Sequence, residues 1–210
     1  QDQQDVYYYI TVMNENYTHP AMPAGVEQDI LKGMYLFRDG GGEQNEPCVQ
    51  LLGAGTILRE VIAAADILKE QYHVNADIWS VTSFNELRRE ALKVARWNML
   101  HPQQPAQSSH VENCLGGRNG PVIAATDYMK IYADQIREFV PGVYRVLGTD
   151  GFGRSDTRQK LRHFFEVDRF FIVIAALKAL ADAGKVPAQI VAEAMEKLGI
   201  DPEKTNPMVS

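Results

Sequence analysis

The chain has 210 residues, of which 45% are hydrophobic and 23% charged, and its formal net charge is −6. This composition is typical of a globular protein with a packed core, and the length suits one sizeable domain with a short appendage. The acidic balance disfavours a nucleic-acid partner, which requires clustered Lys and Arg, and no apolar run is long enough to cross a membrane.

The first part of the chain is irregular. It begins with Gln1 rather than Met and runs at once into an aromatic and β-branched stretch at 7–13, which predicts a buried strand. We therefore expect a piece of a longer protein. Residues 14–25 read as a connector, 26–37 as a weakly amphipathic stretch, and the glycines at 40–42 as a loop tip.

From Cys48 onward, strand-like and helix-like segments alternate. Such alternation implies parallel strands joined by right-handed crossovers. We predict an α/β fold, an open and mostly parallel sheet with helices on both faces. The long connection at 101–120 is of a length that usually marks a functional or mobile loop. The predicted strands are 48–52, 76–81, 121–126 and 144–147; the predicted helices are 56–71 and 128–139, capped by Thr56 and Asp127, and 84–100, 156–165, 169–183 and 187–198.

A partial dinucleotide motif follows the first of these strands. Gly53 and Gly55 stand at the strand end, and Asp77 lies on the next strand, at the spacing of a dinucleotide fingerprint. Leu58 occupies the position where that fingerprint needs its third glycine. A tight structural turn is the favoured interpretation of the two glycines.

A second near-motif is Thr149-Asp150-Gly151, which resembles the Gly-Asp-Gly that begins a thiamine diphosphate and magnesium site. Thr149 stands where a glycine is needed, and the next asparagine along the chain is Asn206. One aspartate cannot supply the near-octahedral set of oxygen ligands that magnesium requires. We assign no metal-binding or cofactor-binding residue to this segment.

The histidines and cysteines predict no catalytic or metal centre. The sequence contains neither a His-x-x-x-His nor a Cys-x-x-Cys pair, and no carboxylate partner stands out near a histidine, so solvated surface histidines are favoured. The Gly-x-Ser-x-Gly elbow of many hydrolases is missing from the sequence. Two cysteines are too few for a disulfide framework, which indicates free thiols in a cytoplasmic protein. The residues concerned are His19, His73, His101, His110, His163, Cys48 and Cys114.

Two surface features have simple interpretations. Basic and acidic residues alternate along 87–93, which predicts a solvated, salt-bridged helix face. Phe164, Phe165, Phe170 and Phe171 are more aromatic rings than one helix face can bury. We expect part of this cluster to meet a partner subunit.

Several runs of sequence together resemble the homodimeric bacterial pyruvate dehydrogenases, and one of them has a looser counterpart in transketolases. The resemblance implies that residues 1–25 are the tail of a preceding pyrimidine-binding domain with a linker. Residues 26–210 would then form a transketolase C-terminal-like domain. The runs are 7–11, 13–17, 81–87, 96–102, 144–156, 164–168 and 204–208.

The resemblance also implies a function for the parent chain. Such enzymes decarboxylate pyruvate on thiamine diphosphate with magnesium and acetylate the lipoyl group of a dihydrolipoyl acetyltransferase component. Their catalytic groups lie in the two preceding domains, so we expect no catalytic, cofactor or metal residue here. The role implied for this segment is structural, in extending the homodimer interface and supporting the active-site domains.

Two alternatives stay open. One is a regulatory ligand-binding module, with a crevice at the carboxyl ends of the strands lined by 53–55, 80–84 and 150–154. The other, which we favour least, is an independent oxidoreductase built on the incomplete glycine fingerprint. Neither alternative involves a nucleic acid or a membrane.

Overall fold

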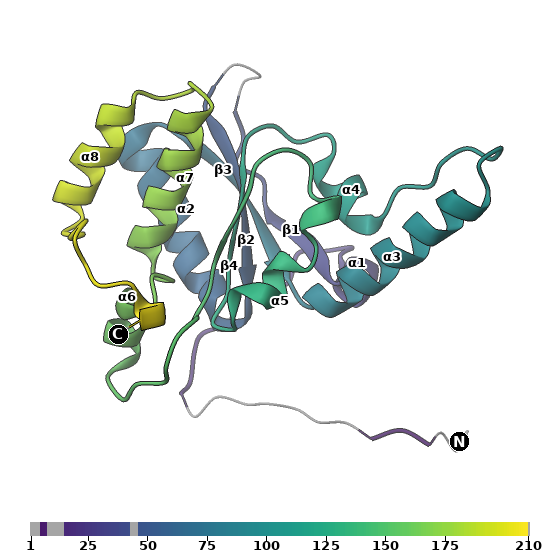
Figure 1. Ribbon diagram of the computed structural model, residues 1–210, viewed down its shortest axis with the longest axis horizontal. Coiled ribbons are helices and arrows are strands. Elements are labelled where there is room, and N and C mark those ends of the chain that lie inside the picture. Colours follow the sequence, from purple (N-terminus) through teal and green to yellow (C-terminus); the bar gives the residue numbers. More distant parts are fainter. Residues whose placement is uncertain (1–4, 8–14, 43–45, 210) are drawn as a thin grey trace.

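A five-stranded sheet forms the centre of the computed structural model, which describes residues 5–7, 15–42 and 46–209 (Figure 1). The strand order is β1-β3-β2-β4-β5, with β2 to β5 parallel and β1 antiparallel to β3 at the edge. The prediction of an open, mostly parallel sheet is confirmed. The strands are β1 (Met34–Arg38), β2 (Cys48–Ala54), β3 (Asn75–Val81), β4 (Val122–Ala125) and β5 (Tyr144–Leu147).

Helices cover both faces of the sheet, as predicted (Figure 1). One face carries α2, α7 and α8, and the other carries α1, α3, α4 and α5. The short α6 lies beyond the carboxyl ends of the strands. The helices are α1 (Glu27–Lys32), α2 (Leu58–Tyr72), α3 (Phe84–Leu100), α4 (His110–Leu115), α5 (Lys130–Asp134), α6 (Arg158–Phe164), α7 (Arg169–Asp182) and α8 (Ala188–Lys197).

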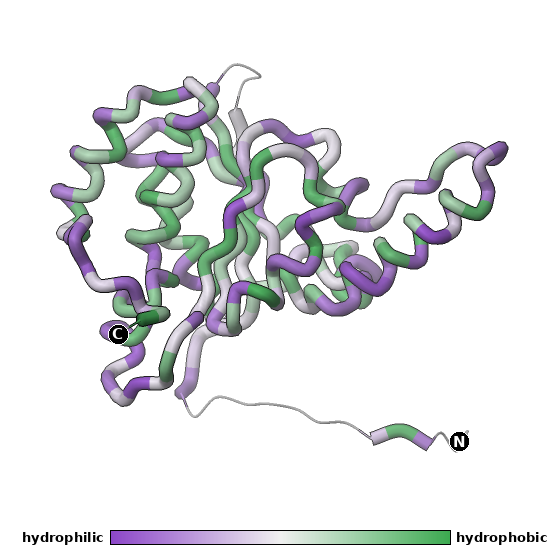
Figure 2. Tube along the Cα trace, in the orientation of Figure 1, coloured by the Kyte–Doolittle hydropathy of each residue, from purple (hydrophilic) through white to green (hydrophobic). Residues whose placement is uncertain are grey.

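Two hydrophobic cores lie on opposite faces of the sheet because successive strand residues point to opposite sides. Val49 and Leu51 of β2 pack against α2 and α7, whereas Leu52 faces the α3 side. β4 alternates in the same way, with Ile123 on the α2 side and Ala124 on the α3 side. Figure 2 shows the apolar residues concentrated along the central strands and the helices that cover them. None of the described helices is both long and apolar enough to span a membrane.

The stretch 26–37 is not the weakly amphipathic segment that the sequence predicts. It divides into α1 and β1, and Gly33 separates them with φ +110. Gly33 accepts backbone hydrogen bonds from Thr82 and Ser83, which ties this turn to the end of β3. The strand predicted at 7–13 lies almost entirely outside the described residues.

The single helix predicted over 128–139 is wrong. The Lys130 amide donates to Asp150 Oδ1 at 2.9 Å, so α5 begins there, and a separate 3-10 turn follows at Arg137–Phe139. Tyr144 also donates its hydroxyl to the Ala133 carbonyl at 2.8 Å, near the end of α5. Asp127 is therefore not a helix cap.

Two further differences concern helix starts. Thr56 does not cap α2, because a 3-10 turn at Gly55–Ile57 precedes that helix and no side chain caps it. The predicted loop at 101–120 contains α4, which begins with a reciprocal capping box between Ser109 and Glu112. The Ser-x-x-Glu spacing is a sequence signal for this helix, and the prediction of a continuous loop overlooked it.

We predict that Gly120→Ala strongly destabilises the fold. Gly120 has φ +90, and a Cβ there would lie 1.9 Å from the Cys48 carbonyl oxygen at the start of β2. Backbone strain and this clash together should lower the free energy of unfolding by more than about 2 kcal/mol, measured by urea denaturation. Gly117→Ala is the matched control, since nothing lies within 4 Å of a Cβ at that position. Equal stability of the two variants would contradict the prediction.

Candidate functional site

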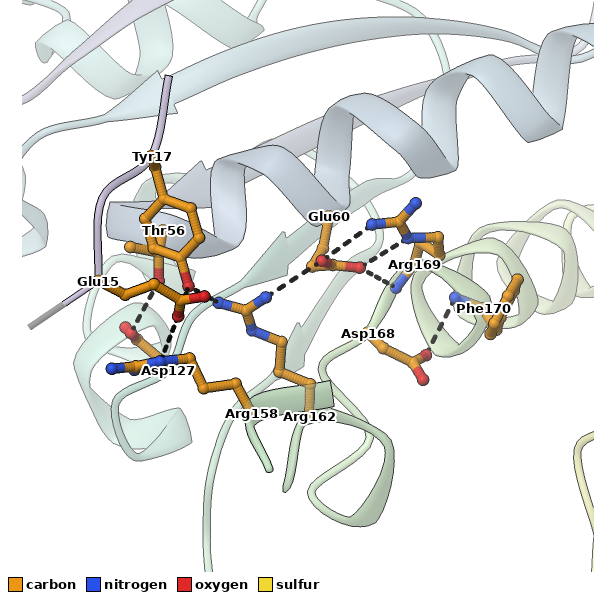
Figure 3. Close-up of polar contacts among 10 residues, drawn as sticks. All are labelled: Glu15, Tyr17, Thr56, Glu60, Asp127, Arg158, Arg162, Asp168, Arg169 and Phe170. Carbon is orange, nitrogen blue, oxygen red and sulfur yellow. Dashed lines mark hydrogen bonds and ion pairs between the residues drawn. The ribbon is translucent and has the colours of Figure 1, made fainter. Parts of the chain in front are cut away.

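The carboxyl ends of β2 and β4 meet at the topological switch point of the sheet. β2 connects through α2 to β3 on one side of itself, whereas β4 lies on its other side. In open α/β sheets the crevice outside such strand ends is the usual ligand site. Polar side chains that follow the two strands meet here, with Thr56 Oγ1 donating to Asp127 Oδ2 at 3.3 Å (Figure 3). We take this crevice as the candidate functional site.

The crevice contains a cavity of about 340 Å³ with a basic lining. Three arginines face it and only one carboxylate does, so its electrostatic character suits an anion. Two threonines, two glycines and three apolar side chains complete the wall. The polar and glycine lining consists of Thr56, Asp127, Thr149, Gly151, Gly153, Arg154, Arg158 and Arg162.

Helix α6 brings two of these arginines together. The Thr157 hydroxyl accepts from the Lys160 amide at 3.4 Å and caps the helix. Arg158 and Arg162 are one helical turn apart and therefore share a face. Arg158 Nε pairs with Glu15 Oε2 at 2.5 Å, and Arg162 reaches the crevice from deeper in the structure, where it is half-buried.

Glu60 is the buried centre of the polar network beside the crevice (Figure 3). Its side chain is 7% exposed, and Arg169 donates to it from Nε at 2.8 Å and from Nη2 at 3.1 Å. The Arg169 amide adds a third bond at 3.1 Å, and Arg162 Nη1 lies 3.4 Å from Glu60 Oε1. Burial opposes ionisation of Glu60, but the hydrogen bonds and charges of the two arginines outweigh it and hold the pKa of Glu60 below its usual value.

A larger cavity of about 900 Å³ adjoins this network on the side of α7. His163 Nδ1 lies 2.9 Å from Asp168 Oδ2, and Asp168 Oδ1 also caps α7 by accepting from the Phe170 and Phe171 amides at 3.0 Å. An Asp–His pair can orient a general base. Among the described residues that line the cavity none is Ser, Thr or Cys, so the pair has no hydroxyl or thiol there to activate.

The residues of the partial dinucleotide motif do not converge. A Cβ on Gly53 would lie 2.8 Å from Leu58 Cα, so the glycine allows α2 to pack closely on β2. Gly55 has φ +56, a backbone conformation that favours glycine in a tight turn. Asp77 lies opposite Gln50 in the sheet and accepts a hydrogen bond from Gln50 Nε2 at 2.9 Å. It therefore stands three residues before the β3 position that lies opposite Gly53. A dinucleotide site needs its acid near the strand end, so this geometry does not support the oxidoreductase alternative.

Asp150, of the second near-motif, caps a helix. Its Oδ1 accepts from the Lys130 amide, and Thr149 donates its hydroxyl to the Asp127 carbonyl at 2.8 Å. Within the described ranges, no three His, Cys, Asp or Glu side chains gather in a way that could hold a metal ion. The described residues therefore do not fit thiamine diphosphate with its magnesium.

The histidines depart from the sequence-based interpretation at two positions. His163 does have a carboxylate partner, Asp168, only five residues away, which the sequence-based interpretation overlooked. His110 is buried, and its Nε2 lies 2.9 Å from the Met34 carbonyl oxygen. His19 and His73 are exposed as predicted, and the exposed His101 stacks on Trp97 with ring centroids 4.5 Å apart.

The cysteines are free thiols, as predicted. Burial raises the pKa of the Cys114 thiol to about 11, and burial likewise raises the pKa of Cys48. A thiol with a raised pKa is a poor nucleophile at neutral pH. Neither cysteine therefore adds a reactive group to the site.

The two surface features of the sequence have clear positions. Arg88, Arg89 and Lys93 on α3 are exposed, and Arg89 pairs with Glu86, which confirms the solvated, salt-bridged face. The four phenylalanines of the cluster are all half-buried. Phe164 and Phe165 meet edge to face with centroids 4.9 Å apart, and Arg154 lies 4.0 Å over the Phe164 ring.

Comparisons with known proteins agree on one family. Residues 33–168 match the transketolase-like C-terminal domain. Over 209 residues the chain is 63% identical to the pyruvate dehydrogenase E1 component of Pseudomonas aeruginosa, covering 99% of this chain and 24% of that protein. It is 49% identical to the corresponding protein of Escherichia coli, covering 99% of this chain and 23% of that protein. The chain thus spans about a quarter of the length of these relatives.

Solved structures show the same fold at low sequence identity. A Pichia stipitis transketolase superposes with a TM-score of 0.51 at 13% identity, covering 75% of this chain and 19% of that chain. A second structure of a transketolase from the same yeast gives 0.50 at 14% identity, covering 73% and 19%. These matches support the arrangement of the sheet and its helices.

We predict that Glu60→Gln destabilises the protein in a pH-dependent manner. Removing the carboxylate leaves Arg162 and Arg169 without their shared buried partner, which should lower the free energy of unfolding at pH 7 by about 3 kcal/mol. Because the folded-state pKa of Glu60 is lowered, its contribution is present above its unfolded pKa and is lost as the pH falls through the folded value. The difference from the parent protein should therefore shrink toward about pH 3 in urea titrations.

Glu70→Gln is the matched control, because Glu70 is an exposed acid on the same helix. It should change stability by less than about 0.5 kcal/mol at either pH. A Glu60→Gln deficit that stays constant from neutral to acidic pH would show that the charge of Glu60 is not what stabilises the network.

Proposed function

The chain belongs to the transketolase-like C-terminal domain family, and from this we propose that it is the C-terminal domain of a pyruvate dehydrogenase E1 component. The observation that carries the proposal is 63% identity over 99% of the chain to a protein of that name. Supporting it, the described residues form a sheet with both faces covered, the cavity beside His163 and Asp168 is lined by no described Ser, Thr or Cys, and the described residues bring together no metal ligand set.

In this proposal the parent chain performs the chemistry. It decarboxylates pyruvate on thiamine diphosphate with magnesium, and it passes the acetyl unit to the lipoyl group of a dihydrolipoyl acetyltransferase component in the cytoplasm. The cofactor and the groups that activate it lie in parts of the parent outside this chain. The polar network around Glu60 serves to hold α2, α6 and α7 together rather than to react.

The proposed domain boundary falls near residue 25. Residues 1–25 would be the tail of the preceding pyrimidine-binding domain with its linker, and residues 26–210 the transketolase C-terminal-like domain. The family match at 33–168 and the first described helix at Glu27–Lys32 both support this division. The described residues 15–25 carry no helix or strand, as a linker would.

Helix α3 supports an additional role in joining two copies of the parent chain. Beyond Ala91 the helix buries no residue, and it projects away from the sheet with the returning loop beside it (Figure 1). Asn98 and Gln107 hold the loop to the helix through two hydrogen bonds of 2.8 and 2.9 Å. Met99 and Leu100 are 70% and 51% exposed at its far end. An ordered arm with an apolar end is suited to an interface between subunits.

We predict that the 210-residue chain does not decarboxylate pyruvate when supplied with thiamine diphosphate and magnesium. The physical reason is that the described residues offer no ligand set for the metal. Decarboxylation would be measured by reduction of an artificial electron acceptor. Turnover by the chain alone would refute its assignment as a supporting domain.

The same assay provides a positive test in the parent protein. A parent chain cut before residue 26 should lose activity, and adding residues 26–210 as a separate polypeptide should restore part of it. If the shortened parent is folded and fully active without these residues, the supporting role is wrong.

We predict that Met99→Glu with Leu100→Glu weakens self-association of the parent chain. Both side chains are exposed, so charges there should leave the stability of a single subunit unchanged, whereas buried charges at an interface would be costly. The dissociation constant of the dimer, measured by sedimentation equilibrium, should rise at least about tenfold. Leu31→Glu on α1 is the control, because Leu31 is also 70% exposed but belongs to a different helix. An unchanged dimer would exclude the arm from the interface.

A further inference from the structure

A segment of the chain itself lies against the crevice at the switch point. Glu15 and Tyr17, which precede the first helix, lie against two arginines of α6 (Figure 3). Tyr17 also contacts Arg59 of α2. The contact joins positions 145 residues apart in sequence at Tyr17 and Arg162. It brings an otherwise irregular segment back onto the edge of the sheet where ligands usually bind.

Each of three arginines contacts a different chemical feature of this segment. The Glu15 carboxylate pairs with Arg158 at 2.5 Å, and Arg162 Nη2 donates to the Tyr17 hydroxyl at 3.3 Å. Arg59 Cζ lies 4.3 Å from the centroid of the Tyr17 ring, in cation–π contact. The Tyr17 hydroxyl in turn donates to Glu15 Oε2 at 2.7 Å. A carboxylate, a ring face and a phenolic oxygen thus meet three matching guanidinium groups.

The receiving surface is set by the fold rather than by the segment. Arg162 is oriented by Glu60, whose position is fixed by α7 through Arg169. Arg158 is placed on the same face of α6, one turn earlier. A surface that is oriented in advance loses less entropy when a peptide binds to it.

We propose that Arg59, Arg158 and Arg162 form a docking site for the chain's own segment Glu15-Asn16-Tyr17. The docked segment takes two of the arginines that line the 340 Å³ cavity, so the basic edge of the crevice serves to hold the entering chain. Docking fixes the path of residues 15–25 into the domain. The inference stands independently of the proposed function, since it concerns contacts within this chain.

A small anion is the competing occupant, as in a regulatory ligand-binding module. Arginines at a strand-end crevice suit phosphate or carboxylate groups. The structure favours the segment because it engages a ring and a hydroxyl in addition to a charge. Inorganic phosphate is therefore included in the test.

The test is limited proteolysis of the 210-residue chain with chymotrypsin, which cleaves after tyrosine. Tyr7 is 91% exposed and serves as the reference within the same molecule, whereas Tyr17 is half-buried in the dock. Cleavage after Tyr17 should be at least about fivefold slower than after Tyr7, as mass spectrometry of the products would show. Equal rates of cleavage at the two tyrosines would overturn the proposal.

Substitutions in the dock should release the segment. Arg59→Gln with Arg158→Gln removes the ring contact and the ion pair, and should speed cleavage after Tyr17 about five- to tenfold relative to Tyr7. Tyr17→Phe retains the cleavage site and the ring but loses the hydrogen bond of the hydroxyl. This variant should speed cleavage after residue 17 about twofold. Arg154→Gln is the matched control, since Arg154 lines the same cavity but contacts Phe164. Cleavage that responds no more to the dock variants than to the control would reject the docking site.

Two further experiments distinguish docking of the segment from other causes of a changed cleavage rate. Glu15→Arg and Arg158→Glu should each release the segment, and the two together should restore protection, which unfolding of the variants could not produce. Phosphate should have the same effect on cleavage after Tyr17 as sodium chloride of equal ionic strength. Faster cleavage in phosphate alone would identify an anion site and overturn the segment as its occupant.

Discussion

The buried carboxylate of Glu60 is the interaction on which the carboxyl edge of the sheet depends. It stands in the first turn of α2 and accepts from Arg169 at the start of α7, with Arg162 of α6 beside it. A buried ion pair adds little net stability relative to apolar packing, but removing one partner leaves a costly uncompensated charge. Glu60 therefore acts chiefly as a positional constraint, because its hydrogen bonds require Arg162 of α6 and Arg169 of α7 to lie beside the first turn of α2.

The position of Glu60 constrains the side chains around it. Asp168, next to Arg169, caps α7 and also contacts His163, so the turn between α6 and α7 is held from both ends. Arg162 then has one guanidinium nitrogen on Glu60 and another directed at Tyr17. The polar groups of this edge thus satisfy one another. A site of mutually satisfied ion pairs is suited to support and assembly, whereas an active site usually keeps a reactive group poised for its substrate.

The sequence predicts this fold well where the information is local. Periodic apolar patterns predicted β2, β3, α3 and β5, because the period of a strand or a helix can be read from neighbouring residues. It fails where a distant residue decides the outcome. The start of α5 depends on Asp150, which arrives from the far side of β5, and β1 forms only against β3. The Glu60 network was invisible for the same reason, since its arginines lie 102 and 109 residues away. The Asp168 partner of His163 and the capping box of α4 were local signals that could have been found.

The crevice of an α/β sheet is a consequence of topology, because reversing the strand order leaves a gap at the switch point whatever the sequence. What occupies that gap is decided by side chains. Here the strand-end glycine Gly53 serves close packing of α2 on β2, since a Cβ at Gly53 would strike Leu58. The basic groups come instead from α6, beyond the sheet, and they face outward toward the entering chain. In the proposed docking, a topology that elsewhere binds small molecules holds a segment of polypeptide instead, which accounts for a strand-end crevice lined by arginines.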